Sequence, residues 1–177
     1  TDVRRDRESL RKSEELLALA VDSAKLGVFD WKLGEFPMSW SARMEEIYGF
    51  PLHEFDGKFG TLMGRIHPED RFSREELYAY SERPDARYHR EYRVVLPDGT
   101  IRWIAAYGQF TRDASGVPTR LSGVAMDITE RKTSEEILKK YASRLSHLRE
   151  VDAAILAARS LTEIADAALR HLTELVP

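Results

Sequence analysis

The sequence contains no cysteine among its 177 residues. This absence excludes disulfides, thiolate zinc sites, iron–sulfur clusters, and cysteinyl nucleophiles or adducts, and it fits a reducing compartment. No apolar run approaches the roughly 20 residues that a membrane-spanning helix needs, and the N-terminus lacks the apolar core of a signal peptide. We therefore expect a cytoplasmic chain with no membrane contact of its own, although a longer parent protein could still be anchored in a membrane.

An excess of charge of one sign is also absent. The formal net charge is -3, from 27 basic and 30 acidic residues. Such a balance gives no electrostatic reason to expect a nucleic-acid partner. The chain also lacks a nucleophile-and-base arrangement, a metal-ligand cluster and a glycine-rich phosphate loop. We expect a protein that is not an enzyme and that holds no metal ion.

The centre of the chain is typical of a β-hairpin. Two runs rich in β-branched and aromatic residues flank Pro97-Asp98-Gly99. In this turn, proline presets the φ angle of the first position and glycine takes the left-handed one. A second turn, Asp113 to Gly116, follows one strand later. Together the two turns predict a three-stranded antiparallel meander.

The turn type decides which side chains of the meander share a face, because a slip of one residue exchanges the faces. A type I turn with a glycine bulge pairs Tyr92 with Ile104, and a second turn built the same way pairs Ile104 with Met126. A two-residue Asp-Gly turn would instead mix the faces. The predicted inner face is apolar and comprises Tyr92, Val94, Ile104, Ala106, Val124 and Met126. The predicted outer face is amphipathic and comprises Glu91, Arg93, Ile101, Trp103, Ala105, Tyr107, Ala125 and Asp127.

Helices are predicted on both sides of the meander. Residues 1–24 and 130–160 carry apolar stripes at helical spacing, the second with a fault around Leu148 where the heptad is irregular. Residues 161–177 predict another amphipathic helix. Between the first helix and the meander, two shorter helices are expected. Ser41 can cap a helix over residues 42–48, and Pro68 suits the first turn of a helix that runs to about Pro84.

Several short motifs follow one another between about residues 14 and 132. They are His67-Pro68-Glu69-Asp70-Arg71, Glu91-Tyr92-Arg93 with Pro97-Asp98-Gly99, Arg102-Trp103, Gly123, and Asp127-Ile128-Thr129-Glu130-Arg131-Lys132. In order and spacing, the set resembles a PAS sensor domain of the kind found in bacterial signalling proteins. The resemblance implies an α+β fold, in which a five-stranded antiparallel sheet carries short helices on one face and is flanked by N-terminal and long C-terminal amphipathic helices.

The tail from Leu148 to Pro177 is similar to the opening helix of a GAF domain. Taken together, the two resemblances divide the chain into four parts. These parts are an N-terminal amphipathic helix (1–24), a PAS domain (25–129), a signalling helix or coiled-coil connector (130–160) and the truncated start of a GAF domain (161–177).

The PAS resemblance implies a sensory and dimerisation module of a multidomain bacterial signalling protein. We expect a homodimer through the terminal helices and the outer sheet face, with a histidine kinase or diguanylate cyclase as output domain. The residues expected on the relay and dimer face are Arg93, Arg102, Trp103, Tyr107, Asp127 and Thr129. An alternative is the phosphoacceptor helix of a histidine kinase at His147, although the Arg-Thr-Pro that usually follows such a histidine is missing.

A second alternative is a sensor that binds a small molecule or flavin in its core. The residues expected to line such a pocket are Trp40, Met44, Tyr48, Met63, Tyr92, Val94, Ile104, Val124 and Met126. We expect first a filled core that binds no cofactor. A core that binds a small aromatic metabolite or a non-covalent flavin ranks second. Chromophores attached through cysteine are excluded. Haem is disfavoured because His67 lies in a turn that starts a helix and His89 lies at a strand entrance.

Overall fold

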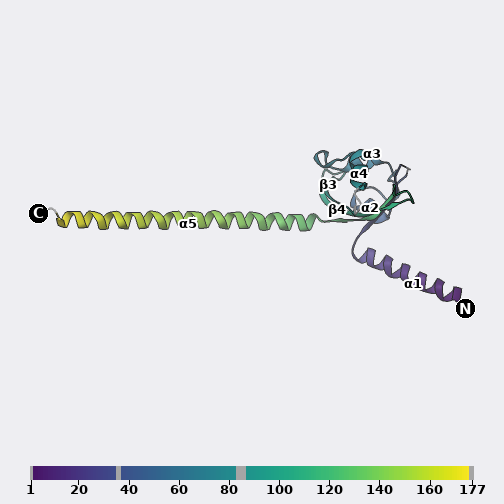
Figure 1. Ribbon diagram of the computed structural model, residues 1–177, viewed down its shortest axis with the longest axis horizontal. Coiled ribbons are helices and arrows are strands. Elements are labelled where there is room, and N and C mark those ends of the chain that lie inside the picture. Colours follow the sequence, from purple (N-terminus) through teal and green to yellow (C-terminus); the bar gives the residue numbers. More distant parts are fainter. Residues whose placement is uncertain (1, 35–36, 83–86, 176–177) are drawn as a thin grey trace. The chain divides into compact units, whose positions relative to one another are not determined.

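The computed structural model describes residues 2–34, 37–82 and 87–175 (Figure 1). The predictions that fall on residues 1, 35–36, 83–86 and 176–177, including the helix end at Pro84, lie outside this part. The chain divides into two compact units, Thr1–Glu130 and Arg131–Pro177, and each is described by itself. The helices are α1 (Asp2–Ser23), α2 (Ala42–Ile47), α3 (Phe59–Arg65), α4 (Arg74–Ser81) and α5 (Thr129–Leu175), with a 3₁₀ turn at Pro68–Asp70. The strands are β1 (Gly27–Lys32), β2 (Ser39–Trp40), β3 (Arg87–Val95), β4 (Ile101–Arg112) and β5 (Pro118–Asp127).

The five strands form one antiparallel sheet in the order β2-β1-β5-β4-β3. Its inner face packs against the short helices, because Met44 of α2, Phe59 of α3 and Leu77 of α4 share one buried cluster with inner-face side chains of the strands. The α+β fold with a five-stranded sheet, short helices on one face and a long C-terminal helix is therefore confirmed.

The first hairpin has the predicted register. Tyr92 pairs with Ile104, and the Leu96 N–H donates to the Thr100 carbonyl at 2.9 Å. Gly99 adopts φ 85°, the left-handed conformation that the bulge requires. Local turn chemistry thus predicted this register correctly.

The predicted register of the second hairpin is wrong by one residue. Arg112 pairs with Pro118, but the next pair is Thr111 with Arg120, which leaves Thr119 as an extra residue in β5. This irregularity pairs Ile104 with Asp127 in place of Met126. Because side chains alternate along a strand, the shift exchanges the two sets of β5 side chains between the inner and outer faces.

The face assignments in β5 change accordingly. Ala125, which was predicted on the outer face, is fully buried on the inner face opposite Ala106. Asp127, also predicted on the outer face, pairs with Ile104 and therefore belongs to the inner-face set of β5. Val124 and Met126, which were predicted on the inner face, pair with Tyr107 and Ala105 on the outer face. The outer face therefore gains two half-buried apolar side chains.

The segment after Pro68 also differs from the prediction of one helix. It forms a 3₁₀ turn and, after a break, the separate helix α4. The break arises at Ser73, whose hydroxyl accepts the Glu76 N–H while the Glu76 carboxylate accepts the Ser73 N–H. This capping box starts a new helix and lets Phe72 enter the core. The predicted cap of α2 is confirmed, since the Ser41 hydroxyl accepts the Met44 N–H.

The second unit consists of α5, which starts in the first unit and continues without interruption past residue 160. Its apolar stripe is exposed, and so are the apolar side chains of α1 such as Leu10 and Leu17. None of the helices within the described residues is both long and apolar enough to cross a membrane. The division into a connector and a GAF-like start remains a prediction.

Candidate functional site

The core contains a cavity of about 40 Å³ between the inner sheet face and the short helices. Its lining is almost entirely apolar and aromatic and comprises Phe29, Trp31, Met38, Trp40, Met44, Tyr48, Phe59, Leu62, Phe72, Leu77, Tyr88, Tyr92, Ala106 and Leu121. Such a volume holds about three waters, whereas pockets for drug-sized ligands and cofactors measure roughly 300–1,000 Å³. No lining residue of the described chain is a histidine or cysteine. These residues therefore do not fit a flavin or an axially ligated haem in this conformation.

Four of the predicted pocket residues, Trp40, Met44, Tyr48 and Tyr92, line this cavity. The other predicted residues lie elsewhere. Val94 and Ile104 are fully buried in the core wall, Met63 is half-buried against the core, and Val124 and Met126 lie on the outer face as described above. Sequence reasoning missed the contributions of Phe29, Trp31 and Tyr88, which become neighbours only when the sheet forms.

The polar groups of the cavity wall include two tyrosine hydroxyls that bond to each other. Tyr48 of α2 and Tyr92 of β3 are buried, and their hydroxyls form a hydrogen bond. Burial raises the pKa of both phenols well above the usual value of 10, so both are neutral at physiological pH. The pair thus holds α2 to the sheet without placing a charge in the core.

A buried carboxylate organises the loop after α2. Glu45 is 5% exposed and accepts the N–H groups of His53 at 2.8 Å and Phe55 at 3.2 Å. The Phe55 ring stacks on Trp40 with 3.7 Å between ring centroids. Because Trp40 lines the cavity, this loop closes one of its sides. The sequence contained no evident signal for this role of Glu45.

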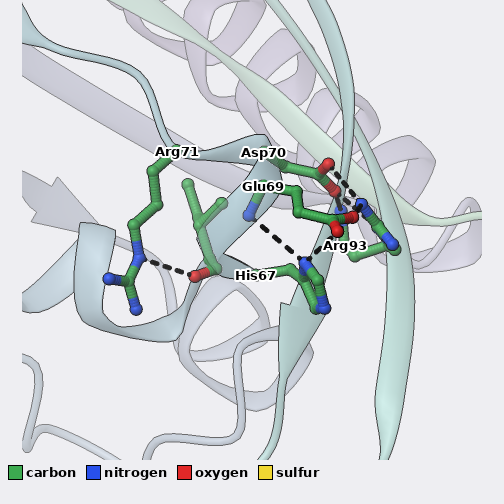
Figure 2. A network of polar contacts seen from close by, with 6 residues as sticks. His67, Glu69, Asp70, Arg71 and Arg93 are labelled. Atoms are coloured by element: carbon green, nitrogen blue, oxygen red, sulfur yellow. Dashed lines mark hydrogen bonds and ion pairs between the residues drawn. The ribbon is translucent and has the colours of Figure 1, made fainter.

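Figure 2 shows the polar network that joins the His67–Arg71 segment to β3. Both carboxylate oxygens of Asp70 accept from the Arg93 side chain, at 2.8 and 2.7 Å, and the Arg93 backbone N–H donates to Asp70 at 2.8 Å. Glu69 accepts from the same guanidinium at 2.8 Å, and the His67 N–H donates to the Arg93 carbonyl. The hydrogen bonds from Arg93 lower the pKa of Asp70 to about 2.

On the outer face, the Arg93 guanidinium also lies over the Trp103 ring, 5.7 Å from its centroid. Arg102 pairs with Asp127 at 3.6 Å, whereas the carboxylate partners of Arg93 are Asp70 and Glu69.

The start of α5 is bonded to the backbone of β4. The Trp103 N–H donates to the Thr129 hydroxyl at 2.9 Å, and the Ile128 N–H donates to the Trp103 carbonyl at 2.8 Å. Asp127 accepts from the N–H and the hydroxyl of Thr129, at 2.9 and 2.5 Å. Arg102 then reaches the α2 carbonyls of residues 46 and 47, at 3.0 and 3.1 Å. We call these contacts of residues 102, 103, 127 and 129 the α5 junction.

The remaining residue predicted on the relay and dimer face is Tyr107, which lies on the outer face opposite Val124. It is 41% exposed and stacks on His89 of β3, with 4.5 Å between ring centroids. Ile101, also on this face, is 45% exposed. The predicted phosphoacceptor His147 is exposed on α5. Within the described residues, no group of three or more side chains could hold a metal ion.

Residues 37–125 match the family of the PAS fold. This chain belongs to that family. A structure of a sensory box histidine kinase/response regulator from Burkholderia thailandensis E264 superposes with a TM-score of 0.61 at 31% identity, covering 74% of this chain and 98% of that one.

Curated relatives of the chain are signalling proteins. The probable diguanylate cyclase DgcE of Escherichia coli K12 is 31% identical over 131 residues, which cover 74% of this chain and 12% of the relative. The sensor protein FixL of Bradyrhizobium diazoefficiens is 24% identical over 137 residues, which cover 77% of this chain and 26% of the relative. The chain thus corresponds to a small part of each relative. This part is a PAS sensor domain, a kind of domain that is usually non-catalytic, although the complete relatives include kinases and cyclases. Its role is that of a sensor domain in signalling.

Proposed function

We propose that this chain is a dimeric sensory module whose state is passed through the α5 junction to an output domain, a histidine kinase or a diguanylate cyclase, in the parent protein. The observation that carries the proposal is the pair of hydrogen bonds between Trp103 and the first residues of α5. Through these bonds, a displacement of β4 in the sheet moves the start of the output helix as well. A ligand or a dimer contact then changes the output to the extent that it favours one pose of α5 over another.

A route from the core to the α5 junction supports this proposal. Tyr92 lines the cavity and neighbours Arg93 on β3. Arg93 in turn lies over Trp103, whose backbone holds the start of α5. A change in the cavity that shifts β3 therefore reaches the start of α5 through Tyr92, Arg93 and Trp103.

Exposed apolar surface supports dimerisation. On the outer sheet face, Val28, Ile101 and Tyr107 are each between 37% and 45% exposed. On α5, the exposed stripe comprises Ile137, Leu138, Tyr141, Leu145, Leu148, Val151 and Ile155. Burial of apolar surface stabilises by about 25 cal/mol per Å², so pairing of two copies along these surfaces provides the driving force.

We expect Asp127→Ala to loosen the α5 junction. The substitution removes the acceptor for both Thr129 donors and the ion pair with Arg102, and losing a helix cap costs about 1 kcal/mol. Hydrogen-exchange protection at the first amides of α5 should fall about fivefold, and output of the parent protein should change. Asp113→Ala is the matched control, because Asp113 makes equivalent local bonds to Ser115 and Val117 in the turn between β4 and β5 and shares none of the bonds of the α5 junction.

We expect Trp103→Ala to weaken the dimer, because it removes the largest aromatic side chain of the outer face. Light scattering over a concentration series should show the dimer dissociation constant raised about tenfold or more, as expected for a lost aromatic anchor. Unchanged oligomeric state in Trp103→Ala together with unchanged output in Asp127→Ala would contradict the proposal. Phosphotransfer that disappears in His147→Gln would instead favour the phosphoacceptor alternative.

A further inference from the structure

His67, at the start of the 3₁₀ turn, makes side-chain contacts that the proposed function does not use. Its Nδ1 atom accepts the Glu69 N–H at 3.4 Å and so caps the turn. An imidazole nitrogen that accepts a hydrogen bond carries no proton, so this contact requires the neutral ring with its proton on Nε2. The charge state of His67 therefore decides whether the turn keeps its cap.

The Glu69 carboxylate lies between two basic groups. Its Oε2 atom accepts from the Arg93 guanidinium at 2.8 Å and lies 3.9 Å from Nδ1 of His67 (Figure 2). Because the same oxygen faces both groups, a positive charge on His67 competes with Arg93 for it. The Glu69 side chain is 73% exposed and can turn from one partner to the other, whereas Asp70 is held by three hydrogen bonds from Arg93.

The turn is attached to an edge strand of the sheet at Arg93. The His67 N–H donates to the Arg93 carbonyl at 2.9 Å, and the Arg93 N–H donates to the Asp70 carboxylate at 2.8 Å. Since β3 is the last strand in the sheet order, these bonds lie along its free edge. A change in the turn thus acts on both the backbone and the side chain of Arg93, which lies over Trp103.

Other charged groups surround His67 on each neighbouring element. Arg71 of its own segment donates to a backbone carbonyl at 3.1 Å, Arg65 at the end of α3 lies over a phenylalanine ring, and Glu91 lies on the outer face of β3. Asp70 has a pKa of about 2 and stays ionised at neutral and mildly acidic pH. Histidine is the side-chain type that ordinarily changes charge between about pH 5 and 8, so a proton signal in this range enters the network through His67.

We propose that His67 is a proton switch. The neutral ring caps the turn and leaves Glu69 to Arg93. Protonation turns Nδ1 from an acceptor into a donor, which releases the Glu69 N–H and draws the Glu69 carboxylate away from Arg93. As a signal, this change rests on the proposed function, because it would reach α5 through Arg93 and Trp103.

NMR titration of the full chain between about pH 8 and about pH 5.5 tests the switch. The signals of the Glu69 N–H and the Arg93 Nε–H should follow the same titration curve as the ring C–H signals of His67. In His67→Asn this curve should be lost at both positions, because asparagine caps a helix start without taking up a proton. His89→Asn is the matched control: it removes a β3 histidine that stacks on Tyr107, and the curve should persist.

Glu69→Gln separates the two parts of the switch. The backbone N–H at position 69 should still respond to pH because its acceptor is lost, while the response of the Arg93 Nε–H should disappear because the carboxylate is gone. An Arg93 response that persists in Glu69→Gln would contradict the transfer of the carboxylate. A constant Glu69 N–H signal in the unchanged chain, or an unaltered curve in His67→Asn, would overturn the proposal.

The proton switch and the proposed function fail separately. Titration at Glu69 and Arg93 with constant amide signals at Trp103 and Thr129 would support the switch and contradict the relay through the α5 junction. An inert Asp127→Ala would also contradict the relay alone, because the bonds of Asp127 are not shared with His67 or Glu69.

Discussion

Gly123→Ala is expected to destabilise the fold by about 3 kcal/mol or more, at the upper end of what overpacking costs. Gly123 of β5 lies opposite Gly108 of β4. A Cβ at Gly123 would lie 2.0 Å from the Tyr107 carbonyl oxygen, 2.7 Å from the Gly108 Cα and 2.7 Å from Cζ of Phe29. Two of these atoms belong to the backbone of β4 and cannot rotate away, so β4 and β5 must separate.

Urea unfolding followed by circular dichroism measures this effect. Gly60→Ala is the matched control, because a Cβ at Gly60 meets nothing within 4 Å and Gly60 lies in helix α3. Alanine favours a helix over glycine by about 1 kcal/mol, so the control should be neutral or slightly stabilising. A Gly123→Ala chain as stable as the unchanged protein would show that β4 and β5 are not as close as the structure places them.

Asp70→Asn is expected to destabilise the fold by about 2 kcal/mol at neutral pH. The pKa of Asp70 falls from 3.8 to about 2 on folding, because Arg93 donates to its carboxylate. Each unit of this pKa shift corresponds to about 1.4 kcal/mol. The Asp70 carboxylate is shielded from solvent, so most of this energy contributes to the free energy of unfolding. The substitution removes the charge and leaves the guanidinium with weaker acceptors.

The pH dependence of stability gives the same prediction a second readout. Because the folded pKa lies below the unfolded one, the ionised Asp70 stabilises the protein above about pH 4, and this stabilisation is lost as the pH falls from 4 towards 2. In Asp70→Asn this part of the acid-induced loss should be missing. Glu69→Gln provides the control: Glu69 shares the same guanidinium but its side chain is 73% exposed, so its effect should stay below about 1 kcal/mol. Equal losses in both variants would contradict a special role for Asp70.

The Asp70 prediction also concerns the proposed signal route. Asp70 fixes the side chain of Arg93, and Arg93 lies over Trp103 at the α5 junction. If Asp70→Asn folds but changes the exchange protection of the first α5 amides, the His67–Arg71 segment is coupled to the output helix.

Several contacts of the site join residues that lie far apart in the sequence, and no local sequence pattern reveals them. Asp70 and Arg93 are 23 positions apart, and no local motif links them. Glu45 is distinguished from other helical glutamates by the loop that folds back onto it. The Arg90 guanidinium lies over the ring of Phe72, which belongs to a different segment.

The sequence by itself determined the elements whose cause is local. The register of the first hairpin follows from Pro97 and Gly99, the cap of α2 from Ser41, and the family from motifs whose spacing is visible along the chain. Only the tertiary structure decided which side chains of β5 face the core, because the extra residue at Thr119 shifts the pairing by one. It also decided the size and the lining of the cavity. These properties depend on the simultaneous packing of strands and helices distant in sequence, and a pairing shift of a single residue is enough to exchange core and surface.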